Sequence, residues 1–240
     1  MTSGKDPYIR TKALIGEDAA ERLRQARIAV FGIGGVGGYV VEALARSGVG
    51  TLDLIDHDDV DFTNLNRQII ALRSTIGRRK TDVFAERIHD IDPSIAVNTY
   101  PIFYLPETRA EFPFEQFDYI VDAIDTVSAK LDIICAAKEL GIPVISAMGC
   151  GSRLDPAKLM ITDVYKTQGD PLAKVMRREL KKRNIRSLKV VYSAEPPIKP
   201  LIDLREEGSV RRSVPGSSPF VPAAAGLLIA SAVCRDIIAG

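Results

Sequence analysis

A glycine-rich segment between two apolar runs constrains the fold of this chain more than any other feature. Residues 28–31 are apolar and lead directly into the sequence GIGGVG at 32–37. Apolar residues then recur at helical spacing as far as Ser47-Gly48, and a second apolar run, 51–55, ends in Asp56. This order predicts a strand, a glycine turn, a helix and a second strand, the arrangement that presents helix N–H groups to a phosphate.

The glycines of this turn have distinct expected tasks. The first makes the tight turn, the middle ones let the backbone approach a phosphate, and the last lets the helix pack on the strand. The acid nineteen residues beyond the last glycine is placed to bond a ribose hydroxyl. A purely structural glycine turn is the alternative, and the surrounding strand–helix–strand pattern favours a nucleotide. We therefore assign to nucleotide binding Gly32, Gly34, Gly35, Gly37 and Asp56.

Predicted strands and helices alternate through the first 147 residues. Apolar runs at 95–100, 117–123 and 143–147 are separated by helical patterns at 81–91 and 126–140. This alternation predicts an α/β fold, a Rossmann-like, mostly parallel sheet with helices on both faces.

The pattern loosens in the C-terminal third of the chain. We expect a further strand at 159–164, a helix at 170–182 and a mobile, proline- and serine-rich connection at 196–218. Helical spacing resumes at 220–238, and this C-terminal extension is expected to pack on the core or on a second subunit.

Polar side chains gather where the predicted strands end. Because the carboxyl ends of parallel strands share one edge, Gly32, Asp56, Asp122 and the loop around Gly149 should converge there. Asp122 and Asp125 could hold a metal ion. The connection after Asp56 and the start of the next helix add donors and charge beside the glycine turn, from Asp58, Asn64, Arg67, Gln68 and Lys80.

This equipment suits phosphoryl or adenylyl transfer, in which positioning and charge neutralisation do most of the work. Hydride transfer is disfavoured, because the chain has only two histidines and no evident acid–base residue in a separate substrate domain. His89 lies among apolar neighbours on a predicted helix and is expected to be structural.

Composition excludes several classes of protein. A net charge of +1 argues against a uniformly basic nucleic-acid binder. Three scattered cysteines without a C-x-x-C pair exclude a four-cysteine zinc site and indicate a reducing compartment. The N-terminus is not a signal peptide, and the apolar stretch 220–233 is too short for a membrane span. We therefore expect a soluble, cytoplasmic protein without membrane contact.

A basic run follows Asp170-Pro171, with eight basic residues and one acid between Pro171 and Lys189. It is either a solvated helix face or a surface that attracts nucleic-acid phosphates.

Four separated segments resemble the adenylating superfamily of ubiquitin-activating enzymes and bacterial sulfur-carrier adenylyltransferases. They are RIAVFGIGGVGG, LIDHDDVDFTNLNRQ, GRRKTDV and VDAIDT, in the order in which that superfamily has them. The resemblance implies ATP and Mg²⁺ as cofactors, a homodimer, and an activated carboxylate with release of diphosphate. It also implies that Asn64, Arg67 and Lys80 contact the phosphates, that Asp125 binds magnesium, and that Arg10 reaches into the partner subunit's site.

Further segments are similar to the tRNA threonylcarbamoyladenosine dehydratase family. These are SAMGCGSRLDP, KTQGDPLAKVMRREL, VYSAEPP and SSPFVPAAAG, so the resemblance spans nearly the whole chain. It implies ATP-dependent cyclisation of threonylcarbamoyladenosine in tRNA through an acyl-adenylate, with Arg10, Arg67, Lys80 and Asp125 as catalytic residues. The basic run becomes a tRNA-contact surface formed by Lys174, Arg177, Arg178, Lys181, Lys182 and Arg183.

The same resemblance implies a single domain over 1–240. Residues 8–150 form its nucleotide-binding core, and 151–240 form the part that handles substrate and dimerises. A sulfur-transfer protein is a possible further partner.

Two other functions remain open on the sequence. An activating enzyme for a ubiquitin-like or sulfur-carrier protein would use the same pocket and require a thiol, for which Cys150 is the one ambiguous candidate. Cys135 and Cys234 are expected in the core and in helix packing. A non-catalytic nucleotide sensor would bind ATP without releasing diphosphate.

Overall fold

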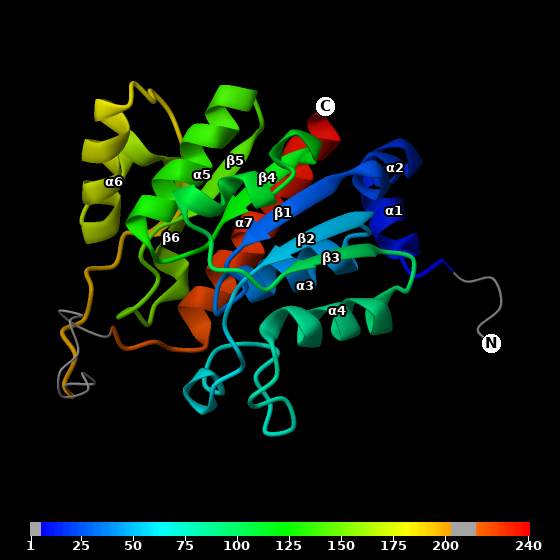
Figure 1. The fold of residues 1–240 in the computed structure, drawn as a ribbon, viewed down its shortest axis with the longest axis horizontal. Coiled ribbons are helices and arrows are strands. Elements are labelled where there is room, and N and C mark those ends of the chain that lie inside the picture. The colour runs from blue at the N-terminus through cyan, green and yellow to red at the C-terminus, as the bar shows by residue number, and fades with distance from the viewer. Residues whose placement is uncertain (1–5, 203–214) are drawn as a thin grey trace.

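The computed structural model describes residues 6–202 and 215–240 (Figure 1). Its strands are β1 (Arg27–Phe31), β2 (Thr51–Ile55), β3 (Ala96–Tyr100), β4 (Tyr119–Asp122), β5 (Val144–Ala147), β6 (Leu159–Asp163) and β7 (Lys189–Ser193). Its α-helices are α1 (Ile9–Ile15), α2 (Glu17–Gln25), α3 (Gly37–Arg46), α4 (Lys80–Ile91), α5 (Val127–Leu140), α6 (Pro171–Lys182) and α7 (Phe220–Ala239).

The strands form one seven-stranded sheet in the order β3-β2-β1-β4-β5-β7-β6. All neighbouring pairs are parallel except β6 with β7, which is antiparallel. The predicted α/β, mostly parallel sheet is therefore confirmed. Strand β7 was not predicted, because its short apolar run, Val190–Tyr192, directly follows the basic run.

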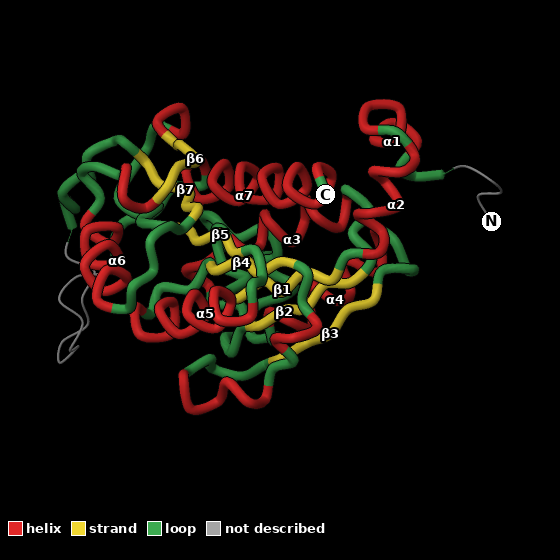
Figure 2. The backbone as a smooth tube through the Cα atoms, turned by 90° about the horizontal axis from the view of Figure 1, so that it is seen from above, coloured by secondary structure: helices red, strands yellow, loops and turns green. Residues whose placement is uncertain are grey.

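Helices cover both faces of the sheet, as Figure 2 shows with α3 and α7 on one side and α5 on the other. Residues of α3, α4 and α7 pack with β1, β2 and β5 in one apolar cluster. Residues of α5 and α6 pack with aromatic side chains of the 102–117 segment in a second cluster on the opposite face. The sheet is thus buried on both sides, as a parallel sheet requires.

Helix α7 packs closely on the core. A Cβ on Gly226 would lie 2.4 Å from Val36 O, so the glycine allows α7 to approach the start of α3. The helix is 20 residues long and is apolar and long enough to cross a membrane, so the expectation that this stretch is too short is wrong. Of its apolar residues, Val221, Ala225, Ile229 and Val233 are fully buried, which accounts for its composition as that of a core helix.

The predicted connection 196–218 is described in part, because residues 203–214 lie outside the described chain. On either side of them, the backbone is tied to one loop: Ile198 N donates to Ser152 O and Ser152 N donates to Gly216 O, both at 2.7 Å.

Candidate active site

The glycine turn lies at the carboxyl end of β1. Gly32 has a φ of +80°, and a Cβ on it would lie 2.8 Å from Ala123 O. A Cβ on Gly37 would lie 1.8 Å from Gly32 O, so both positions require glycine. Gly34 and Gly35 have room for a Cβ and line a cavity of about 320 Å³. The first and last glycines therefore shape the turn, and the middle ones keep its backbone open to the cavity.

Asp56 closes the turn from the end of β2. Its carboxylate accepts hydrogen bonds from Ile33 N and Asp58 N, both at 2.9 Å. Asp56 also lines the cavity, where its oxygens can accept from a ribose hydroxyl.

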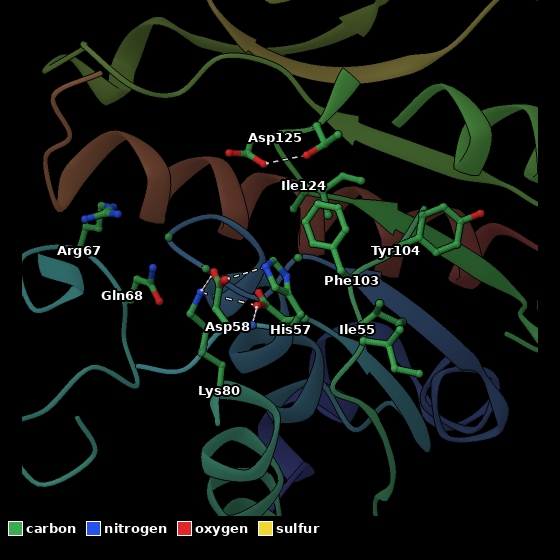
Figure 3. Close-up of a pocket in the computed structure, with 17 residues that line it drawn as sticks. Ile55, His57, Asp58, Arg67, Gln68, Lys80, Phe103, Tyr104, Ile124 and Asp125 are labelled. Carbon is green, nitrogen blue, oxygen red and sulfur yellow. Dashed lines mark hydrogen bonds and ion pairs between the residues drawn. The ribbon is translucent and has the colours of Figure 1, made fainter. Parts of the chain in front are cut away.

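Lys80 is the first residue of α4 and is buried, with 4% of its surface exposed. Its Nζ lies 2.6 Å from Asp58 Oδ2 and 3.6 Å from Asp56 Oδ1. The ammonium is thus held at the cavity wall by two carboxylates (Figure 3).

Arg67 and Gln68 lie at the same end of the cavity (Figure 3). The Arg67 guanidinium donates to Thr63 O at 2.8 Å and to Asn66 Oδ1 at 2.9 Å, both neutral acceptors. Burial lowers the pKa of Arg67, because desolvation disfavours its charged form. Gln68 Oε1 is buried and has no hydrogen-bond partner within the described residues. The Arg67 guanidinium is the group that an anionic ligand would satisfy, whereas Gln68 Oε1 is an acceptor and requires a donor such as a hydroxyl.

Asp125 follows β4 and presents an exposed carboxylate to the cavity. Asp122 does not: it is fully buried, accepts from Ser146 Oγ at 2.5 Å and pairs with Lys130 Nζ at 3.0 Å. The expectation that Asp122 could hold a metal is therefore wrong, because both of its oxygens are occupied.

A magnesium ion fits Asp125 better than the acids opposite. Ligand atoms of Asp56, His57 and Asp58 lie within 4.8 Å of one another, but the Lys80 ammonium already occupies this group and repels a cation. Mg²⁺ is usually held by one or two carboxylates together with substrate phosphates, a role open to Asp125.

The other end of the cavity is apolar, with Ile55, Phe103 and Tyr104 on the side away from Arg67 (Figure 3). His57 packs edge-on against Phe103 with ring centroids 4.4 Å apart. Residues 101–116, which lie between two predicted strands, were assigned no role from the sequence, so this wall was missed. The available signal was that residue 101 follows β3, whose carboxyl end lies at the same edge as that of β2.

Three predicted site residues do not line this cavity within the described chain. Gly37 is buried in the turn. Asn64 is 8% exposed, and its Oδ1 accepts from Asp61 N at 3.2 Å in a capping box. Arg10 is exposed on α1, at the opposite end of the sheet (Figure 1).

The predicted basic surface lies on α6, capped by Asp170, which accepts from Ala173 N at 2.7 Å. Arg177 is half-buried and donates to Thr167 O at 3.0 Å, so its guanidinium is held by the fold. Glu179 pairs with three bases, and Lys182, Arg183 and Arg178 lower its pKa to about 2. The exposed bases are Lys174, Arg178, Lys181, Lys182 and Arg183.

The cysteines carry no activated thiol in the described structure. Burial raises the pKa of Cys150 to about 12, which leaves it protonated at neutral pH. Cys234 packs beside the first apolar cluster, as expected. Cys135 is half-buried on α5 instead of lying in the core.

A cavity with an apolar end, a glycine turn and a cationic end suits a nucleoside triphosphate. A family model described as the ThiF family matches residues 8–232. The chain belongs to the ThiF family.

Relatives within the ThiF family are similar over nearly the full length. A tRNA threonylcarbamoyladenosine dehydratase of Bacillus subtilis is 41% identical over 239 residues, covering 96% of this chain and 94% of that protein. The structure of an Escherichia coli tRNA N6-threonylcarbamoyladenosine dehydratase, TcdA, with ATP has a TM-score of 0.87 at 35% identity, covering 97% and 94% of the two chains. Its complex with AMP has a TM-score of 0.86 at 36% identity, covering 96% and 93%. The resemblance found in the sequence is confirmed.

Proposed function

We propose that this ThiF-family chain is an ATP-dependent tRNA threonylcarbamoyladenosine dehydratase. The observation that carries this conclusion is that Arg67, Lys80 and Asp125 all line the cavity beside the glycine turn. Full-length similarity to the Bacillus subtilis dehydratase, including the C-terminal third, supports the same function.

The reaction activates a carboxylate and then closes a ring. A carboxylate oxygen of the threonyl group attacks the α-phosphorus of ATP, and diphosphate leaves. The neighbouring carbamoyl group then attacks the acyl-adenylate and AMP leaves. The oxygen lost from the nucleoside departs with AMP, so the tRNA loses one water in total. Because the ring-closing nucleophile belongs to the substrate, the protein only has to align it.

The charged residues stabilise the transferring phosphoryl group. Arg67 and Lys80 neutralise negative charge on the phosphates, and Gln68 and Gly34 offer neutral donors beside them. Asp56 binds the ribose, and Asp58 holds the Lys80 ammonium in place before ATP arrives. Asp125 would hold Mg²⁺, which neutralises phosphate charge when bound.

A homodimer completes the site by bringing Arg10 of one subunit to the other. Two observations support this proposal. Arg10 lies too far along the sheet to serve its own cavity, and α1 buries none of its residues, with Ile9 59% and Leu14 85% exposed. Large apolar side chains left uncovered on one short helix are typical of an interface.

The part formed by 151–240 is proposed to handle the tRNA, in the cytoplasm and without membrane contact. The exposed bases of α6 would contact tRNA phosphates, with Arg177 holding the helix in position instead of binding RNA. A sulfur-transfer protein stays a proposed partner to which no residue is assigned.

The proposed function is tested by measuring diphosphate release from ATP with two tRNA preparations. One carries threonylcarbamoyladenosine, and the other is the same tRNA transcribed without modifications. We expect stoichiometric diphosphate and AMP only with the modified tRNA. Equal release with both tRNAs would contradict the proposal.

Activation of a carrier protein is the second candidate, and the structure disfavours its thiol. Cys150 is 7% exposed, donates to Met148 O at 3.5 Å and is protonated at neutral pH. A non-catalytic sensor would give ATP binding with no diphosphate from either tRNA.

A further inference from the structure

A second, largely apolar groove lies beside the candidate active site. Its volume is about 330 Å³, and its walls come from residues 152–154, 198–202 and 216–218. Leu154, Ile198 and Ile202 contribute apolar surface and are 58%, 45% and 72% exposed. The three segments belong to the motifs SAMGCGSRLDP, VYSAEPP with its continuation, and SSPFVPAAAG, none of which the nucleotide cavity uses.

Backbone hydrogen bonds fix the walls relative to one another. Ser152 stands between the other two segments: its carbonyl accepts from Ile198 N, and its N–H donates to Gly216 O, both at 2.7 Å. The carboxylate of Glu195 accepts from Leu154 N at 3.1 Å and from Asp155 N at 2.9 Å. The groove is therefore held by main-chain contacts before any ligand arrives.

Arg153 braces the floor of the groove and is 3% exposed. Its guanidinium donates to Asp170 Oδ2 at 2.9 Å, to Glu195 O at 3.0 Å and to Gly151 O at 3.1 Å. Ser218 Oγ donates to Arg153 O at 3.2 Å. The side chain of Arg153 thus joins the loop after β5, the start of α6 and the loop after β7, and its backbone carbonyl adds the approach to α7.

The groove lies close to the cationic end of the nucleotide cavity and is linked to it by hydrogen bonds. Ser217 lines the groove, and its carbonyl accepts from Asn66 Nδ2 at 3.0 Å. Asn66 Oδ1 in turn accepts from Arg67, which lines the nucleotide cavity. Two hydrogen bonds, through Ser217 and Asn66, therefore separate the groove from the Arg67 guanidinium.

We propose that this groove binds the base of the modified adenosine, so that the threonyl carboxylate extends past Ser217 toward Arg67. This inference rests on the proposed function and adds to it the place where the substrate nucleoside lies. Bases taken out of single-stranded loops are held by stacking on apolar side chains in small pockets. The groove has that chemistry and a volume at the lower end of small-molecule sites, which suits one nucleoside.

Direct binding tests the groove separately from catalysis. The probes are two anticodon stem-loops, one with threonylcarbamoyladenosine and one with plain adenosine. Each is titrated into the full chain saturated with a non-hydrolysable ATP analogue. The variants are Leu154→Glu and Ile198→Glu, which place a charge against the base. The control is Leu140→Glu, a comparably exposed leucine at the end of α5.

The wild type and Leu140→Glu are expected to bind the modified stem-loop more tightly than the plain one. Leu154→Glu and Ile198→Glu should lose at least about tenfold in affinity for the modified stem-loop, as expected when base stacking is removed. Their affinity for the ATP analogue should match that of the wild type, which shows that they are folded.

Each contrary result has its own meaning. If both groove variants keep the wild-type preference for the modified stem-loop, the groove is not the site of the substrate nucleoside, and the proposed function stands. A wild type that does not distinguish the two stem-loops also overturns the role of the groove. Groove-dependent binding without diphosphate release would support the groove and refute the proposed function.

Discussion

At the scale of single residues, the charged side chains of the cavity are of two kinds, buried and exposed. Lys80 is 4% exposed and held by Asp56 and Asp58, so its position is set before substrate arrives. Asp125 is exposed, and its carboxylate accepts from Thr126 Oγ1 at a long 3.4 Å, so it is open to a ligand. A preorganised cation needs no reorganisation during the reaction. Loss of Lys80 should therefore lower the reaction rate the most.

Replacing Lys80 with alanine should reduce tRNA-dependent diphosphate release by a factor of about 10²–10³, the usual effect of removing one preorganised donor. Thermal unfolding should stay cooperative, because the partner Asp58 is half exposed and can be solvated. The matched control is Arg79→Ala, which removes an exposed neighbouring cation and should leave the rate unchanged. Undiminished release from the Lys80 variant would remove this residue from the mechanism.

Cys150→Ala should retain full diphosphate release and full tRNA conversion. The thiol has a pKa raised to about 12 by burial, so no thiolate is present to attack an acyl-adenylate at neutral pH. Mass spectrometry after alkylation of the folded wild type should find Cys150 unmodified. Loss of activity in this variant, with folding retained, would favour the carrier-protein alternative.

Among the elements, α6 combines a structural face with a charged one. Ala173, Met176 and Leu180 are fully buried against the second apolar cluster. Arg177 is tied to Thr167, whereas Lys174 and Lys181 are exposed. Only the exposed bases are available to tRNA.

Reversing the charge at Arg178, Lys181 and Lys182 should weaken tRNA binding and make it less dependent on salt. For each phosphate that the variant no longer neutralises, the slope of log affinity against log salt should fall by about 0.7–0.9. Filter binding at several salt concentrations measures both quantities, and Lys138→Glu on α5 serves as an exposed control. An unchanged slope would reassign α6 to a solvated surface.

The sequence predicted those elements whose signals are local. The glycine turn, the helix α5 and the Asp170 cap of α6 all follow from residues adjacent in the chain. Strand β7 was missed because its identity depends on pairing with β5 and β6, far away in sequence.

Contacts between residues far apart in the chain also determined which predicted site residues were correct. Asp122 looked like a metal ligand beside Asp125, yet Lys130 from α5 and Ser146 from β5 occupy it. The role of residues 102–104 depended likewise on which strands are neighbours. Neither arrangement is visible from spacing alone.

At the scale of the whole molecule, the proposed active site is complete only when two subunits associate. The nucleotide cavity lies at the carboxyl edge of the sheet, and α1 with Arg10 lies at the far end (Figure 1). A closed two-fold dimer would give each cavity the arginine of the other subunit.

Complementation between variants tests this arrangement. Arg10→Ala and Lys80→Ala should each be inactive alone. When equal amounts are mixed and allowed to exchange subunits, half of the dimers are mixed and each of these has one intact site. Diphosphate release should therefore recover to about a quarter of the wild-type rate, as closed two-fold symmetry requires. No recovery, with subunit exchange verified, would place Arg10 outside the partner subunit's site.

The most direct test of the central claim is mass spectrometry of nucleosides from modified tRNA. Threonylcarbamoyladenosine-containing tRNA is incubated with the protein, ATP and magnesium, then digested and analysed. The account predicts that the modified adenosine loses the mass of one water, only when ATP is present and not with Lys80→Ala. An unchanged modified adenosine in the presence of wild-type protein and ATP would contradict it.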